Sequence, residues 1–300
     1  MTPKRIRLFT SYCLIVLALF VVFGSYAVKA APSVTYTGVN LAGAEFGVDF
    51  GQNKLPGQYG QDYTYPTHDE VNYFVAKGMN TFRIPFRWER LQRQPLAAFD
   101  PAEQSRLDDI VQYATSKGAY VVLDPHNYAR YYDTFFKVIG QELPVSAYID
   151  FWAKLTARYK NNTRVIFGLM NEPNTMPTDL WRDDANAAIR AIRAAGATNL
   201  ILVPGNYWTS ALNWPYDFGD GTNASSMLNI TDSGNNYAFE VHQYLNAGGD
   251  GSEATCVSPT IGIERLQSFT TWLQQHGKRG FLGEFAGDVA GGVGGEVVYT

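Results

Sequence analysis

The sequence predicts an α/β fold, and within that class a (β/α)8 TIM barrel. Short apolar runs alternate along the chain with longer segments of helical character, and this order favours a parallel sheet. Polar and charged residues follow one apolar run after another, which is typical of the carboxyl ends of barrel strands. The same alternation also allows a doubly wound sheet, but the clustering of polar residues favours the barrel.

Helix start and stop signals define the elements of the first part of the chain. Thr67 and Glu70 fit a capping box, which satisfies the first free N–H groups of a helix. Asp100 followed by Pro101 marks a second helix start, and a glycine follows each helix. The expected elements are strand 39–41, a loop rich in Gly and Tyr to Pro66, helix 67–77, strand 81–86, helix 100–117 and strand 120–123.

The fourth strand begins at Val165 and ends in Asn171-Glu172-Pro173. Proline cannot donate to a strand ladder, so the strand should stop there with a carboxylate at its end. Around it the expected elements are helix 147–159, helix 179–195, strand 200–203, a long polar loop through Trp208, Trp214 and Gly221, strand 237–241, helix 261–276 and strand 280–283.

The expected barrel is incomplete at the carboxyl end of the chain. Residues 287–300 are a glycine-rich tail that could hardly supply an eighth strand and a last helix. No linker or charge run divides the sequence before that point. We therefore expect residues 31–300 to form one domain.

The first thirty residues have the pattern of a secretory signal peptide. A basic start is followed by an apolar run from Leu14 to Phe23 and by the small-residue cleavage pattern Val28-Lys29-Ala30. An uncleaved membrane anchor is the alternative, although the apolar run is short for a span. Sequons at Asn161, Asn223 and Asn229 fit a secreted, glycosylated product, and Cys256 is then the only cysteine of the mature chain.

Composition and charge exclude several classes of partner. The chain of 300 residues has a net charge of −4, and the segment 1–30 holds four basic residues and no acidic one. An acidic chain without a basic run argues against nucleic acid and, after signal cleavage, against membranes. With 14% aromatic residues, it is compatible with a neutral polymer such as a glycan.

Eight chemically capable residues stand at the ends of the expected strands. If the chain closes as a barrel, they converge on one face, with two carboxylates on the fourth and seventh strands facing each other. Retaining glycoside hydrolysis needs such a pair, with the carboxyl groups about 5–5.5 Å apart. The eight residues are Arg83, His126, Asn127, Asn171, Glu172, His242, Tyr244 and Glu284.

Other interpretations of this set remain open. His126 and His242 with the two glutamates could ligate a divalent metal, but no HxH or HExxH spacing occurs and Arg83 would repel a cation. The two histidines could also be buried, hydrogen-bonded residues without function. Trp208 and Trp214 could stack on sugar rings or simply pack in the core.

Seven segments together resemble glycoside hydrolase family 5, and specifically its secreted fungal endo-β-1,4-glucanases. They occur in order along almost the whole mature chain. The segments are Gly38–Gly47 (GVNLAGAEFG), Phe82–Phe86 (FRIPF), Asp124–Tyr128 (DPHNY), Asn171–Pro173 (NEP), Gly205–Thr209 (GNYWT), His242–Tyr244 (HQY) and Gly283–Gly287 (GEFAG).

The resemblance implies a role for each strand-end residue. Glu172 would be the acid/base and Glu284 the nucleophile, which Arg83 and Tyr244 would hold ionised. Asn171 would bind the sugar 2-hydroxyl, and His126, Asn127 and His242 would bind around the point of cleavage. Trp208, and less securely Trp214, would stack on glucosyl rings. We expect a secreted monomer that acts on β-glucan without cofactor or metal.

Two departures from the family pattern leave alternatives open. Members carry a tryptophan on the eighth strand and commonly a cysteine soon after the second glutamate, a partner for Cys256, and this chain has neither after Gly287. We therefore expect a truncated or altered carboxyl end, and an inactive glycan-binding relic is an alternative to the enzyme. A β-mannanase or an exo-β-1,3-glucanase could use the same two carboxylates.

Overall fold

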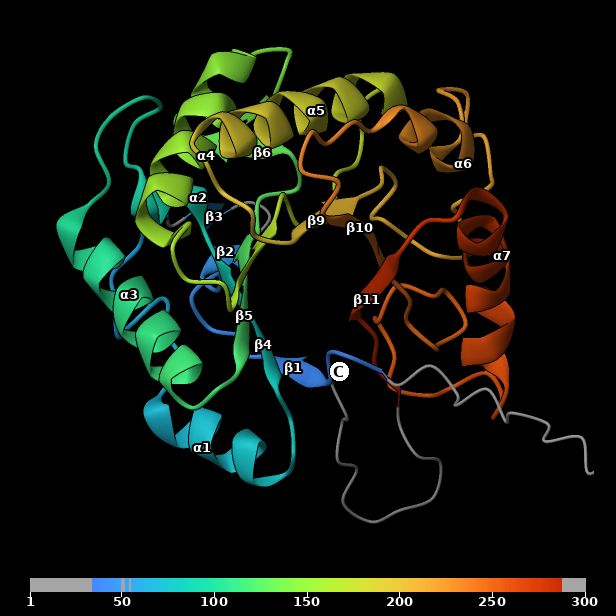
Figure 1. Ribbon diagram of the computed structural model, residues 1–300, viewed down its shortest axis with the longest axis horizontal. Helices are drawn as coiled ribbons and strands as arrows, with labels where there is room; N and C mark the ends of the chain where they lie inside the picture. The colour runs from blue at the N-terminus through green and yellow to red at the C-terminus, as the bar shows by residue number, and fades with distance from the viewer. Residues whose placement is uncertain (1–33, 50–51, 54, 288–300) are drawn as a thin grey trace, which may run out of the picture. The chain divides into compact units, whose positions relative to one another are not determined.

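Seven parallel strands form one sheet in the part of the chain that the computed structural model describes, residues 34–49, 52–53 and 55–287 (Figure 1). Spatial order follows chain order, so the sheet curves into a nearly closed barrel rather than winding in two directions. The strands are β1 (Gly38–Asn40), β4 (Thr81–Phe86), β5 (Tyr120–Pro125), β8 (Val165–Gly168), β9 (Ile201–Pro204), β10 (Tyr237–His242) and β11 (Gly280–Glu284).

The barrel has a seam between its first and last described strands. Within the described residues no eighth strand lies there, and β1 and β11 are not paired with each other. The side chain of Asn40 nevertheless reaches across and donates to the carbonyl oxygen of Gly283 at 2.9 Å. The predicted barrel class is confirmed. The predicted tail from residue 288 onward lies outside the described residues.

In the described part of the chain, five long helices lie around the outside of the strands (Figure 1): α1 (His68–Ala76), α3 (Pro101–Ser116), α4 (Val145–Tyr159), α5 (Thr178–Ala194) and α7 (Ile261–His276). The predicted capping box of α1 is present, because Thr67 accepts from the backbone of Glu70 and Glu70 accepts from that of Thr67. Asp100 caps α3, and Gly277 ends α7 in the left-handed conformation.

The loops hold short elements that the sequence pattern did not predict. They are helix α2 (Trp88–Leu91), the hairpin of β2 (Val48–Asp49) and β3 (Gln52–Asn53), the hairpin of β6 (Arg130–Tyr132) and β7 (Phe136–Val138), helix α6 (Asn223–Ser226) and the 3-10 helix η1 (Met227–Asn229). Elements of two to four residues are too short to show a hydrophobic period.

Two apolar clusters hold the barrel together. The larger one fills the space between strands and helices, with Phe82 and Ile84 of β4 among its members. The smaller one consists of Val122, Ile166, Leu202 and Ala238, from four adjacent strands. Because side chains alternate along a strand, this second cluster lies inside the barrel and fills its lower part.

Two predictions for the amino-terminal segment concern residues that lie outside the described part of the chain. These are the signal peptide 1–30 and the alternative of a membrane anchor. Among the described residues, no helix combines the length and the apolar character that a membrane span requires.

Candidate active site

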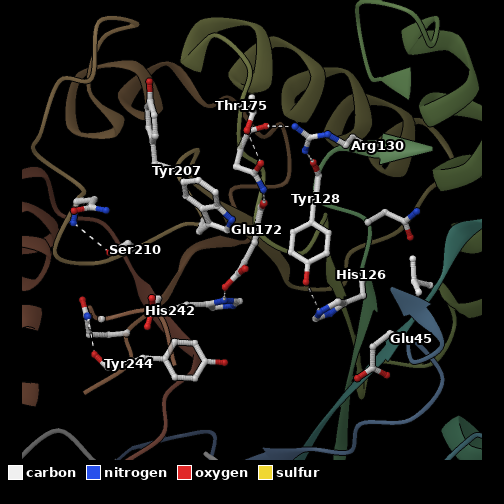
Figure 2. A pocket seen from close by; sticks show the side chains of 18 of the residues that line it. Glu45, His126, Tyr128, Arg130, Glu172, Thr175, Tyr207, Ser210, His242 and Tyr244 are labelled. Atoms are coloured by element: carbon white, nitrogen blue, oxygen red, sulfur yellow. Dashed lines mark hydrogen bonds and ion pairs between the residues drawn. The ribbon is translucent and has the colours of Figure 1, made fainter. Parts of the chain in front are cut away.

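A cavity of about 1360 Å³ opens at the carboxyl ends of the strands. Residues from five strands line it: Glu45 comes after β1, His126 after β5, Glu172 after β8 and Trp208 after β9, and His242 ends β10. Figure 2 shows the side chain of Glu172 pointing toward the ring of His242. The sequence prediction that strand-end residues converge on one face is therefore met.

Glu284, the last residue of β11, is an ionised carboxylate. Arg83 donates to one of its oxygens at 2.8 Å, and the hydroxyl of Tyr244 donates to the other at 2.7 Å. Burial opposes the ionisation of Glu284, but the positive charges of His242 and Arg83 outweigh it and lower the pKa to about 2.

His242 lies between the two glutamates. Its Nδ1 is 2.8 Å from Glu172 Oε1 and 3.5 Å from Glu284 Oε2. Burial disfavours the protonated ring, but the negative charge of Glu284 and the hydrogen bond to Glu172 raise the pKa of His242 to about 10. The imidazole is therefore a cation at neutral pH and donates its Nδ1 proton.

The two carboxylates are close enough for retaining chemistry. One oxygen of Glu172, one of Glu284 and a ring nitrogen of His242 all lie within 4.8 Å of one another. Such a trio could in principle hold a metal ion. A protonated His242 offers no lone pair, however, and Arg83 already occupies an oxygen of Glu284, so the group suits a proton-transfer site better than a cation site.

Arg83 lies at the centre of a buried ionic layer inside the barrel. Besides Glu284, it contacts Asp124 at 2.9 Å and Glu240 at 3.1 Å. Sequence reasoning did not single out Asp124 or Glu240 as site residues. The glycine before Glu284 is a sequence feature that reflects the position of Glu240. A Cβ atom on Gly283 would lie 2.2 Å from the Glu240 carboxylate, so a larger residue would not fit there.

His126 and Asn171 form a second hydrogen-bonded chain above this layer. Asn171 accepts from Arg83 at 2.8 Å, and its Nδ2 lies 3.1 Å from His126 Nε2. Because an amide nitrogen only donates, His126 Nε2 accepts, and its Nδ1 proton faces Asp124 at 2.8 Å. One histidine ring and one amide are thus held in a single orientation.

The side chain of Asn127 is hydrogen-bonded to residues of α2 rather than to the other predicted site residues. Its Nδ2 donates to both carboxylate oxygens of Glu89, and its Oδ1 accepts from the backbone of Trp88. The side chain is buried, and its amide is engaged with α2. These contacts suit the anchoring of the loop after β5 better than direct contact with a sugar.

The two tryptophans of the long polar loop have opposite environments. Trp208 is 50% exposed and lines the cavity. Trp214 is 0% exposed and packs edge-on against Phe239, Phe269 and Trp272, so the expectation that it could stack on a sugar is wrong. Residues 207–209 all have left-handed φ values between 48° and 56°, a strain that non-glycine residues carry only where neighbours impose it.

Glu45 is a cavity residue that the sequence reasoning missed. One of its oxygens accepts from the backbone of Gly43 at 2.8 Å, and burial raises the pKa of its carboxyl. Buried Arg90 donates to the carbonyl oxygens of Ala44 and Phe46, on either side of Glu45. The arginine therefore fixes the loop that presents this carboxyl group to the cavity.

Barrel and site together define a class of protein: a (β/α)8 barrel of glycoside hydrolase type, with facing glutamates at its strand ends. Comparison with known families agrees, since the model of the cellulase family (glycosyl hydrolase family 5) matches residues 39–298. The chain belongs to glycosyl hydrolase family 5.

Three relatives illustrate the similarity. Endoglucanase gh5-1 of Neurospora crassa is 40% identical over 260 residues, which are 86% of this chain and 63%, less than two thirds, of that protein. An endo-β-1,4-glucanase of Xanthomonas axonopodis pv. citri is 45% identical with a TM-score of 0.81, covering 86% and 80% of the two chains. Cel5A of Pseudomonas stutzeri, in complex with cellobiose, is 34% identical with a TM-score of 0.75, covering 84% and 74%.

Proposed function

We propose that the protein is a retaining endo-β-1,4-glucanase that cleaves internal bonds of cellulose or related β-glucans. One observation carries the proposal: a carboxylate oxygen of Glu172, which lines the open cavity, lies within 4.8 Å of one of Glu284, which a buried arginine holds ionised. The names of the relatives support the choice of a β-1,4-glucan over mannan or β-1,3-glucan.

In the first step, Glu284 attacks the anomeric carbon while Glu172, which begins protonated on the oxygen that does not accept from His242, gives that proton to the departing glycosidic oxygen. A nucleophile must be charged, and the lowered pKa of Glu284 meets that condition. Arg83 and Tyr244, one on each carboxylate oxygen, fix its direction of attack.

In the second step, Glu172 takes a proton from water, which attacks the glycosyl-enzyme and releases Glu284. Bond formation has by then removed the negative charge of Glu284, so His242 Nδ1 is left with Glu172 as its carboxylate partner. In this proposal Asn171 binds the 2-hydroxyl of the reacting sugar, and its contacts with Arg83 and His126 hold its amide in one orientation. Trp208 supplies a stacking surface beside it.

Polymer hydrolysis tests the activity directly. We expect the viscosity of carboxymethylcellulose to fall rapidly, with little action on mannan or laminarin. Proton NMR of freshly released sugar should show the β-anomer first. If the α-anomer appears first, the enzyme inverts and the double displacement is wrong. If binding without hydrolysis is found, the protein is a glycan-binding relic.

The matched variants Glu172→Gln and Glu284→Gln test the two roles. On an aryl glycoside with a good leaving group, Glu172→Gln should give a burst and then slow turnover, which azide accelerates because azide needs no general base. Glu284→Gln lacks the nucleophile and should show neither burst nor rescue. Azide rescue of Glu284→Gln alone, giving a β-glycosyl azide, would mean that the roles are reversed. Unchanged circular dichroism serves as the folding control.

We also propose that residues 1–30 are a secretory signal peptide and that residues 31–300 act outside the cell as a monomeric catalytic domain. The support is the basic start, apolar run and small-residue site of the first thirty residues. Amino-terminal sequencing of protein from culture medium should begin near Ala31. A band of full length in the membrane fraction would favour an anchor instead.

A further inference from the structure

The three sequons of the chain differ sharply in accessibility. Asn161 lies in the turn between α4 and β8, and Asn229 ends η1; both are exposed, as are Thr163 and Thr231, which complete their sequons. Asn223, at the start of α6, is only 1% exposed. An N-linked glycan needs a side-chain amide that faces solvent in the folded protein, because the sugar is bulky and hydrated.

The amide of Asn223 is also fully used. Its Nδ2 donates to the carbonyl oxygen of Asn206 at 2.9 Å, and its Oδ1 accepts from the backbone N–H of Asn206 at 2.8 Å. Packing around it is tight, since a Cβ atom on Gly205 would lie 2.8 Å from the Asn223 side chain. A sugar on this nitrogen has no room.

The hydrogen bonds between Asn223 and Asn206 hold the loop that carries Trp208. Asn206 immediately precedes residues 207–209, whose left-handed backbone presents Trp208 to the cavity. Asn206 is held from its other side as well, because its Nδ2 donates to the carbonyl oxygen of Met176 at 2.7 Å. Asn223 is therefore a positioning residue that locks the strained loop, and its sequon is incidental.

We infer that the folded, secreted protein carries N-linked glycans at Asn161 and Asn229 and none at Asn223; this rests on the proposed secretion. Neither acceptor lines the cavity. Asn161 is four residues before β8, at the amino end of that strand, whereas the cavity is at the carboxyl ends. Glycans at these two positions leave the substrate cleft open.

Peptide mapping tests the assignment on the full chain, produced with its own amino terminus in a yeast secretory host. Release of glycans by peptide N-glycosidase in heavy-oxygen water converts each former acceptor to a labelled aspartate. We expect the label at Asn161 and Asn229 and unlabelled Asn223. A label at Asn223, an unlabelled Asn161 or Asn229, or a chain that stays in the cytosol and carries no glycan would each overturn the inference.

Four variants distinguish the effect of losing a glycan from the effect of losing the hydrogen bonds of the Asn223 amide. Asn161→Gln and Asn229→Gln should each remove one glycan and leave activity on carboxymethylcellulose unchanged. Ser225→Ala destroys the Asn223 sequon but keeps the amide, so it should alter neither the glycan mass nor the KM. Asn223→Gln should also leave the mass unchanged, yet raise the KM several-fold with a smaller change in kcat. A lower mass for Ser225→Ala would show a glycan at Asn223. Loss of glycans in a fully active enzyme would overturn this inference and leave the proposed activity intact.

Discussion

The floor and the rim of the cavity differ in burial and in the number of charged contacts. The floor consists of Arg83, Asp124, Glu240 and His242, which are almost inaccessible and meet an opposite charge at 2.8–3.5 Å. The rim consists of Glu45, Phe46 and Trp208, which line the cavity, and its two aromatic rings are half exposed. The floor therefore fixes charge and position for the chemical step, and the rim offers area and hydrogen bonds for binding.

Arg83→Met should have the largest effect, because it removes the cation that three buried carboxylates share. We expect the free energy of unfolding to fall by about 3–5 kcal/mol, and the turnover number of the folded fraction to fall by about 10²–10³-fold. Urea denaturation and initial rates measure the two effects.

Arg93→Met is the matched control for that variant. Arg93 pairs with Asp100 at 3.3 Å near the surface, where an ion pair contributes about 0–1 kcal/mol. If both variants lost the same stability, the buried layer would have no special weight and the contrast between floor and rim would fail.

Trp214 and Trp208 lie in the same loop, but we expect the first to contribute to stability and the second to substrate binding. Trp214→Ala removes a ring from the core and should cost about 3–5 kcal/mol of unfolding free energy. Trp208→Ala should change stability by less than about 0.5 kcal/mol but raise the KM for cellooligosaccharides on the order of tenfold, with kcat retained. A fall in kcat alone for Trp208→Ala would move this residue from the rim to the catalytic step.

The pH dependence of stability should reveal the floor charges. The folded pKa of His242 is about 10 against an ordinary 6.5, so its contribution is complete below pH 6.5 and is lost as the pH rises toward 10. The folded pKa of Glu284 is about 2 against 4.5, so its contribution is present above pH 4.5 and is lost as the pH falls toward 2. Thermal midpoints should therefore fall at both extremes.

Variants assign the two slopes of that profile. His242→Gln should abolish the slope between pH 6.5 and 10, and Glu284→Gln should abolish the slope between pH 4.5 and 2. Because each of these two charges helps to shift the pKa of the other group, each variant should also weaken the second slope without abolishing it. Rim variants should keep both slopes. If Trp208→Ala flattened the profile as His242→Gln does, the titrating groups would not be those of the floor.

Glu45→Gln should have the smallest effect. The amide keeps an acceptor for Gly43 but loses the negative charge that a sugar hydroxyl would meet, so the KM should rise about two- to fivefold, consistent with a hydrogen bond of about 0.5–1 kcal/mol, with kcat unchanged. Steady-state kinetics on cellooligosaccharides measures it. A large loss of kcat would place Glu45 in the catalytic machinery.

Local signals and strand-end motifs were readable from the sequence. The capping box at Thr67, the Asp100 cap and the Gly277 stop each depend on a few adjacent residues, and β4 and α7 have the predicted bounds. His242 and Glu284 end their strands, Glu172 follows β8, and Arg83 lies within β4, with its side chain inside the barrel. Barrel closure is enough to bring these four residues together.

The rest depends on contacts that no local pattern contains. Glu240 becomes a partner of Arg83 only through the register of β10 within the barrel. Trp208 and Trp214 share one polar loop, and what separates them is the packing of Trp214 against Phe269 and Trp272 of α7. Tertiary packing decides burial in both cases, so sequence reasoning could name these residues but not their environments.

The hydrogen bond between Arg83 and Glu284 joins residues that are 201 positions apart in the sequence. This separation determines how long after Arg83 the ribosome synthesises Glu284. At a synthesis rate of about 5–20 residues per second, Glu284, the proposed nucleophile, leaves the ribosome roughly 10–40 seconds after Arg83. Asp124 emerges much sooner than Glu240 and is therefore the first carboxylate available to Arg83. The proposed catalytic pair is thus among the last features of the barrel to assemble, and we expect a nascent chain to lack the proposed hydrolytic activity until β11 joins the sheet.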